Sequence, residues 1–427
     1  MSEIPTKPDR NRAIVVLLLV IASALKVAWA LSSYGSLDVM IFSKFASHLQ
    51  DHSLKYMYDT YPAFNHPPLT AGIIWFLGKV ARMLFADQND QYSCFAASLR
   101  FLSIIADAIV VLGLLHVKRL TNRPPWWAIK IFAISPVSLI VSGFHGNMDP
   151  VMVMFIFLAG LAVLHKRPAL SGLLLALAFN IKVIPILFTP AFFFYWYAQG
   201  PRQVGAFTAA TVGGFFAGAA LPLIQCPVNY ISHVLAYGSV CGVWGITYWL
   251  HTLNIDGFDK VDFRSLSFIQ NCTMNILKLI IVCLATGLAW RRRKSTGVEL
   301  FATLGMVWTL FFVFAPGAVV QYMPWYGPFV LLLAPRWWAA LTAATTIFMV
   351  SYYHPASESH FPWVLAQPTP QQFSWSEPVS NLPWAIFTAL FVVLARQAWR
   401  EYRLEGTEPS RISAPAAEPI LPVCEGT

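Results

Sequence analysis

The sequence predicts an all-α polytopic membrane protein, and three observations carry this prediction. Hydrophobic residues make up 57% of the 427 residues, whereas 11% are charged, far below the roughly 25% of a soluble domain. Apolar runs of near membrane-spanning length recur along the chain. Basic residues gather in alternate turns between these runs, as the positive-inside rule requires.

About twelve spans are expected, because a spanning helix needs about 20 mostly apolar residues and a charge near the bilayer centre is costly. Several runs are shorter than this. The expected spans are 14–31, 99–117, 127–143, 150–164, 169–181, 183–198, 204–222, 273–290, 298–315, 322–335, 337–353 and 382–396. The apolar run 69–85 carries Lys79 and Arg82, and as a span it would reverse the basic turns. We therefore expect it to lie in the outer interface as an amphipathic helix.

The basic turns set the expected orientation. They contain Lys7, Arg10, Arg12, Lys118, Arg119, Arg123, Lys130, Lys166, Arg167, Arg202, Arg291 to Lys294, Arg336, Arg396, Arg400, Arg403 and Arg411. These turns and both termini are then cytoplasmic. The net charge of +9 is explained by this topology and by anionic membrane lipid, so no nucleic acid partner is needed.

The same pattern divides the chain into three parts. We expect residues 1–13 to form a cytoplasmic tail, 14–398 a single transmembrane domain that includes a first outer loop at 32–98, and 399–427 a disordered cytoplasmic tail. Long polar segments fall on the outer side only. Residues that carry chemistry are therefore sought on that side.

Asp38 opens the first outer loop. Apolar residues recur after it at spacings of three and four, which predicts an amphipathic helix that begins at Asp38. The dipole at a helix N-terminus favours the ionised carboxylate and lowers its pKa. The alternative interpretation is that Asp38 only caps this helix.

Two polar corners follow Asp38. His66 precedes Pro67-Pro68, which keep it out of α geometry and start a new helix at Leu69. The turn Gly143-Phe144-His145-Gly146-Asn147-Met148-Asp149-Pro150 places an imidazole, an amide and a carboxylate between two apolar spans. An ordinary membrane turn needs fewer polar groups, so this excess favours substrate contact.

Two cations and an aromatic cluster complete the candidates. Lys182, alone between two apolar runs, either snorkels outward or supplies positive charge to a phosphate at the outer leaflet. Arg100, at the outer start of the second span, is well placed for a lipid phosphate. Gln321, Tyr322 and Trp325 form either an interfacial aromatic belt or part of a binding site.

Lys26 and Asp107 are ionisable residues inside two expected spans. Counted from the outer ends of their spans, their depths differ by only about 3 Å at about 1.5 Å per residue. Charges within the membrane usually pair or line a polar cavity. We therefore predict an ion pair between Lys26 and Asp107; the alternative is that Lys26 snorkels and Asp107 faces water.

In their order along the chain, these motifs resemble the GT-C superfamily of membrane glycosyltransferases. The segment from Asp38 to His66-Pro67-Pro68-Leu69-Thr70 resembles the first lumenal loop of that superfamily. Its Pro-Pro-Leu-Thr is similar to the dolichyl-phosphate-glucose-dependent glucosyltransferases and, as His-Pro-Pro-Leu, to the protein O-mannosyltransferases. The 145–149 turn, Lys182 with Pro185, and Gln321-Tyr322 with Trp325 are similar to the first mannosyltransferase of glycosylphosphatidylinositol assembly.

The resemblance implies a GT-C-type transmembrane bundle. Its implied activity is the inverting transfer of a hexose, glucose or mannose, from a polyprenyl- or dolichyl-phosphate donor to a lipid-linked glycan or protein acceptor on the non-cytoplasmic face. The roles implied are Asp38 as base, Arg100 and Lys182 at the donor phosphate, and substrate binding by His66, His145, Asn147, Asp149, Gln321, Tyr322 and Trp325. The membrane is that of the endoplasmic reticulum in a eukaryote and the plasma membrane in a bacterium.

One departure from the family pattern bears on the cofactor. Members often carry two acids in this loop motif, whereas Ser36-Leu37-Asp38 contains one, and Asp149 is a candidate for the second. The sequence assigns no cofactor, and a divalent metal is left open. A secondary transporter or lipid-carrier protein is the competing interpretation, although the repeated halves typical of transporters are not evident in the sequence.

Overall fold

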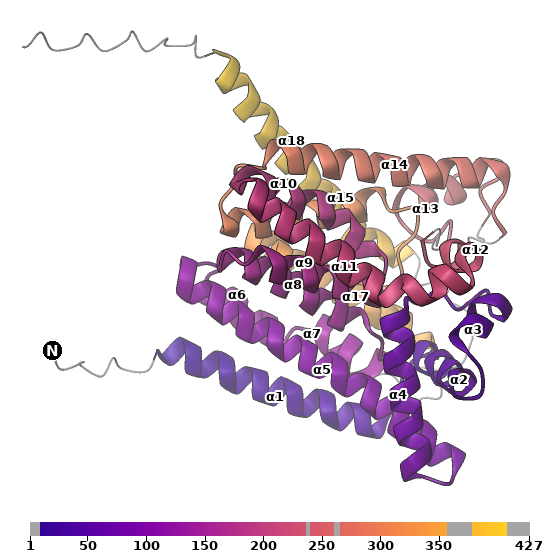
Figure 1. Ribbon diagram of the computed structural model, residues 1–427. Helices are drawn as coiled ribbons and strands as arrows, with labels where there is room; N and C mark the ends of the chain where they lie inside the picture. Colours follow the sequence, from indigo (N-terminus) through magenta and orange to yellow (C-terminus); the bar gives the residue numbers. More distant parts are fainter. Residues whose placement is uncertain (1–8, 236–239, 260–264, 357–377, 408–427) are drawn as a thin grey trace, which may run out of the picture.

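The computed structural model describes residues 9–235, 240–259, 265–356 and 378–407, which form a bundle of helices (Figure 1). Seven helical segments within these residues are long and apolar enough to cross a membrane, and the prediction of an all-α polytopic membrane protein is confirmed. They are α1 (Arg10–Ser32), α5 (Gln88–Thr121), the stretch Trp126–His145, α11 (Pro201–Gln225), α14 (Phe268–Arg291), α15 (Gly297–Phe314) and the stretch Pro378–Arg400.

The expected number of about twelve spans is not confirmed. Helices α8 (Asp149–Leu164) and α9 (Pro168–Ile181) contain 16 and 14 residues, fewer than the roughly 20 that cross a bilayer. Most α8 side chains are buried. The length of α8 and α9 therefore leaves both unconfirmed as spans, and the apolar character of α8 also reflects its burial in protein.

Prolines interrupt two of the other expected spans. The segment 183–198 begins as a 3₁₀ turn, η2 (Ile184–Phe188), and continues as α10 (Thr189–Gln199). The segment 322–335 starts at the last residue of the 3₁₀ turn η5 (Val320–Tyr322). It contains only the seven-residue helix α16 (Gly327–Leu333) before α17 (Pro335–Ala356) begins. Proline lacks an N–H group and clashes with the preceding turn, so each such segment restarts as a new helix.

Figure 1 shows where the loops lie. The start of α1 and the end of α18 (Asn381–Thr407) lie at one end of the bundle, whereas α2 (Leu37–Asp51), α3 (Leu54–Thr60) and α12 (Pro227–Tyr230) gather at the other. Helix α4 (Pro68–Leu84) is inclined to α1 and packs against α2 and α5. The two helices expected in the loop 32–98 are thus present as α2 and α4.

The C-terminal boundary differs from the expectation. Helix α18 continues past residue 399, where the disordered tail was expected to begin, to Thr407. Residues 408–427 of that tail lie outside the described residues.

Glycines allow close packing around α8. A Cβ atom on Gly160 would lie 2.6 Å from the Phe301 ring of α15, and one on Gly113 of α5 would lie 2.5 Å from the Phe157 ring. Small residues let transmembrane helices approach closely in this way. Helix α8 is consequently fixed between α5 and α15, and so is its first residue, Asp149.

Candidate active site

A cavity of about 480 Å³ lies where α2, η2, α14 and the turn before α8 meet. Its lining includes Lys278 of α14, which the sequence analysis did not select. The cavity brings together eight of the ten residues selected from the sequence, namely Asp38, His66, Asn147, Asp149, Lys182, Gln321, Tyr322 and Trp325. The other two, Arg100 and His145, are not part of its wall.

Asp38 lies in the first turn of α2 but does not cap it. The cap is Ser36, whose Oγ accepts a hydrogen bond from the Asp38 N–H at 3.2 Å and donates one to the carbonyl oxygen of His145 at 2.8 Å. The interpretation of Asp38 as a mere cap is therefore wrong. Its side chain, 29% exposed, faces the cavity with Oδ2 3.0 Å from His145 Nε2.

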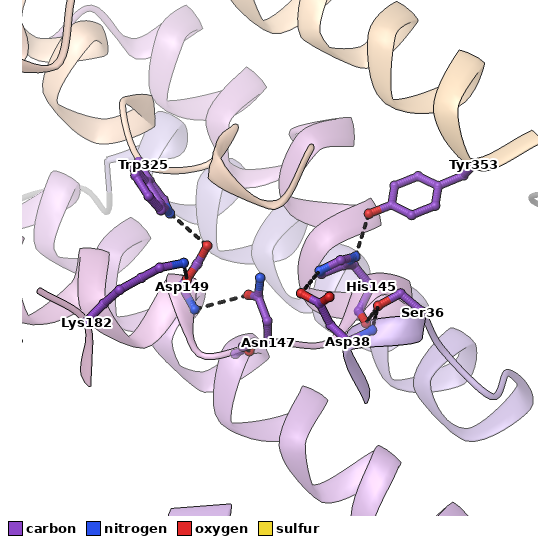
Figure 2. Close-up of polar contacts among 9 residues, drawn as sticks. Ser36, Asp38, His145, Asn147, Asp149, Lys182, Trp325 and Tyr353 are labelled. Atoms are coloured by element: carbon purple, nitrogen blue, oxygen red, sulfur yellow. Dashed lines mark hydrogen bonds and ion pairs between the residues drawn. The ribbon is translucent and has the colours of Figure 1, made fainter. Parts of the chain in front are cut away.

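His145 stands behind Asp38 and ends a π-helical segment, η1 (Leu139–His145). Its Nδ1 lies 2.6 Å from the hydroxyl oxygen of Tyr353 on α17. Nε2–H donates to the Asp38 carboxylate, and the Tyr353 hydroxyl completes the contact at Nδ1, as donor to a neutral imidazole or as acceptor from a protonated one. Figure 2 shows the imidazole between the two partners. Tyr353 was missed because it lies 208 residues from His145, and no local pattern links them.

The charges around the cavity keep Asp38 ionised. Desolvation raises the pKa of its carboxyl group. The charge and hydrogen bond of His145, together with the charge of Lys182, outweigh this effect, so the pKa lies below the ordinary 3.8. His66 behaves differently. Burial and the charge of Lys182 lower its pKa to about 3, so its imidazole is neutral at physiological pH.

A second cluster forms the opposite side of the site. Lys182 Nζ lies 2.8 Å from Asp149 Oδ1, and Trp325 Nε1 donates to Asp149 Oδ2 at 2.9 Å (Figure 2). The ammonium group also lies 4.6 and 4.8 Å from the Tyr322 and Trp325 ring centres. Both carboxylate oxygens of Asp149 thus have partners. Asp149 and the two aromatic rings together hold the Lys182 ammonium group at the cavity wall.

Side chains on one face of α5 form hydrogen bonds with the chain segments that bear the site residues. Arg100, Ser103 and Asp107 follow one another at helical spacings of three and four, so they share a face. Arg100 is fully buried and donates to Ser33 Oγ at 2.7 Å and to the Ser33 carbonyl at 2.9 Å. Ser103 Oγ donates to the carbonyl of Asn147 at 2.6 Å. Helix α5 begins at Gln88, so Arg100 lies well inside it rather than at its start.

The predicted ion pair between Lys26 and Asp107 is confirmed. Lys26 Nζ lies 2.6 Å from Asp107 Oδ2, which also accepts a hydrogen bond from Ser142 Oγ at 2.6 Å. Ser138 Oγ, 2.6 Å from Lys26 Nζ, donates to the same oxygen. The pair therefore ties α1 and α5 to the π-helical segment that ends in His145.

The residues at this site do not fit a divalent metal. Oxygens of Asp38 and Asp149 are engaged by His145, Lys182 and Trp325. Within the described ranges, no group of three or more His, Cys, Asp or Glu side chains could hold a metal ion.

The sequence is similar to that of a known protein family. The family model of glycosyltransferase family 87 matches residues 64–316, more than half of the chain. No curated protein matches. The matched region contains the turn at 145–149, Lys182 and Lys278, and it begins after Asp38. The protein is a membrane glycosyltransferase of the GT-C-like type, and the chain belongs to glycosyltransferase family 87.

Proposed function

We propose that this chain transfers a hexose from a polyprenyl-phosphate donor to an acceptor hydroxyl with inversion of configuration, and that Asp38 is the base. The observation that carries the proposal is the carboxylate of Asp38, kept ionised by its surroundings, across a cavity that also presents Lys182. The acceptor is a lipid-linked glycan or a protein. The chain's membership of a glycosyltransferase family supports the reaction class.

The proposed step is a displacement at the anomeric carbon of the donor sugar. The acceptor oxygen attacks the anomeric carbon from the side opposite the phosphate and forms the new C–O bond. Its proton passes to Asp38, which needs a free carboxylate oxygen within hydrogen-bond reach. The bond between the anomeric carbon and the phosphate oxygen breaks, and its electron pair leaves with the lipid phosphate. Lys182 stabilises the negative charge that develops there.

The remaining residues divide between binding and support. Neutral His66, Asn147 and Gln321 line the cavity and are assigned to hydrogen bonds with the sugar. Tyr322 and Trp325 hold Lys182 by their rings, and Asp149 holds it by charge. His145 fixes the orientation of Asp38.

Arg100 receives a different assignment from the one expected. Because it is buried and engaged with Ser33, outside the cavity wall, we assign it to positioning the segment just before α2 rather than to the donor phosphate.

We place the active site on the non-cytoplasmic face. The cavity lies near the start of α2, whereas the basic turn Arg291–Lys294 lies at the end of α14, with the start of α1 (Figure 1). In a background without the six native cysteines, a cysteine at Ser53 should react with an impermeant thiol reagent from outside and one at Ser295 should not. The reverse labelling would put Asp38 in the cytoplasm.

The transferase activity is tested with purified full-length protein in lipid nanodiscs. Farnesyl phosphate carrying radiolabelled mannose or glucose is the donor, and membrane lipid extract supplies the acceptor. Transfer of label to a new product, with inverted linkage by NMR, supports the proposal. Retained configuration, or movement of label across the membrane of sealed proteoliposomes without a new bond, contradicts it.

A further inference from the structure

A second cavity lies beside the active-site cavity. It has a volume of about 420 Å³ and lies between α14 and the segment formed by η2 and α10. Ile186, Leu187 and Val282 line both cavities, so the two adjoin at these residues. The second cavity, called here the α10–α14 groove, is lined almost entirely by apolar and aromatic side chains.

On both walls, a lysine in the active-site cavity is followed along the chain by apolar residues that line the groove. On one wall, Lys182 precedes the shared residue Ile186 by four positions, and Phe193 and Phe194 lie further along in the groove. On the other wall, Lys278 precedes the shared residue Val282 by four positions, or about 6 Å along the helix. Ala285 and Thr286 then line the groove. Each wall thus runs from a cation, through the junction, to apolar surface.

This order matches an amphiphile with an anionic head and one apolar chain. A lysine in an otherwise apolar spanning helix is costly and is kept where it serves a polar ligand or pathway. The junction is open at the bundle surface, where Ile186 is 56% exposed and Val282 48% exposed. A lipid chain can therefore enter the groove sideways from the bilayer while its head group reaches the cavity.

We propose that the α10–α14 groove binds the isoprenoid chain of the donor and that Lys278 and Lys182 bind its phosphate from opposite walls. This inference rests on the proposed function and places the donor within the site. The sugar then extends from the phosphate toward Asp38, in the same cavity. Lys278 thus provides the second contact with the donor phosphate, a role that was expected for Arg100 from the sequence.

Binding is measured with full-length protein in nanodiscs, separately from transfer. The probes are farnesyl phosphate, inorganic phosphate and farnesol. Loss of one charge-assisted hydrogen bond corresponds to about tenfold weaker binding, so Lys278→Gln should weaken farnesyl phosphate by about tenfold and leave farnesol unchanged. Lys79→Gln is the matched control, because Lys79 is exposed on α4, outside both cavities, and its removal changes the net charge equally.

The groove is tested by filling its junction. Val282→Trp should weaken farnesyl phosphate but not inorganic phosphate, because it blocks the chain and spares the head group. Leu284→Trp is the control, since Leu284 is exposed on the same helix and lines neither cavity. Both control variants should bind farnesyl phosphate as the unsubstituted protein does.

The outcomes separate this inference from the proposed function. If the protein transfers sugar while Lys278→Gln and Val282→Trp bind farnesyl phosphate normally, the donor lies elsewhere and only this inference fails. If farnesyl phosphate binding is lost in both variants but no transfer occurs, the site stands and the proposed function fails. Tighter binding of a two-chain phosphatidic acid than of farnesyl phosphate would assign the groove to membrane phospholipid and overturn the inference.

Discussion

Two pairs of an acid with a basic residue, Lys26 with Asp107 and His145 with Asp38, meet in the stretch Ser138 to His145, and they are built differently. Asp107 accepts hydrogen bonds from Lys26, Ser138 and Ser142, and Lys26 is 3% exposed. Asp38 lies beside one basic side chain, His145, and faces a cavity. One oxygen of Asp107, Oδ2, thus takes three donors, whereas Oδ2 of Asp38 has one contact, so Asp38 keeps more capacity for a further proton donor. The more fully engaged carboxylate suits a structural pair, and the one with more spare capacity suits a base.

The two pairs are also coupled through their positions. Ser138, just before η1, and Ser142 within it contact the first pair, and His145 at the end of η1 belongs to the second. A Cβ atom on Gly143 would lie 3.2 Å from Lys26 Cα, so α1 packs closely against this segment. The inner pair thus fixes the segment that presents His145. Unusual helical turns of this kind often occur at functional sites.

The largest effect on activity is expected from Asp38→Asn. This change keeps the shape of the side chain and removes the base, so transfer should fall by about 10²–10⁴-fold. Initial rates of radiolabelled product formation measure it, with thermal stability as the control. Asp107→Asn should show the opposite pattern, with reduced stability and smaller loss of rate per folded molecule. Equal stability loss in both variants would remove the distinction between the pairs.

The second expected effect concerns stability. Lys26→Met leaves the Asp107 carboxylate without its cation, and loss of one partner of a buried pair costs up to about 3–5 kcal/mol. The double variant Lys26→Met with Asp107→Leu should recover part of this loss, because no buried charge remains. Thermal unfolding in nanodiscs measures both. Strictly additive losses would show that the two residues do not act as a pair.

A smaller effect, on rate alone, is expected at Arg100. Arg100→Gln should lower kcat about tenfold and leave the KM for donor unchanged, because the fork-shaped contact with Ser33 is lost and no donor contact is. Arg100→Lys should not rescue it, since lysine keeps the charge but not the fork. Lys182→Gln should instead raise the donor KM. Rescue by lysine would return Arg100 to the donor phosphate.

The smallest effect at neutral pH is expected from His145→Gln. His145 lowers the pKa of Asp38, and desolvation, which raises it, remains after the substitution. Asp38 must be ionised to act as the base, so the acidic limb of kcat/KM should move to higher pH while rates near pH 7 change little. A pH profile compared with that of Tyr353→Phe measures this shift. An acidic limb that stays in place would mean that His145 does not set the ionisation of Asp38.

The sequence predicted well what depends on the bilayer. Because charges are costly in hydrocarbon, composition alone indicated the all-α membrane class. Lys26 and Asp107, each isolated in an apolar segment, were likewise expected to form an ion pair. For the same reason, the polar residues outside the expected spans were good candidates, and most of them line one cavity. The number of spans was not confirmed, because an apolar helix covered by protein resembles one covered by lipid in its composition.

The partners of each polar group were decided only by the tertiary structure. Whether Arg100 faces a cavity or Ser33 depends on helices that pack from distant parts of the chain. Tyr353 and Lys278 gave no local signal, since one sits in an apolar helix beside other aromatics and the other resembles a snorkelling lysine. A hydrogen bond is a short-range contact with strict geometry, and sequence spacing fixes that geometry only within a helix or a turn.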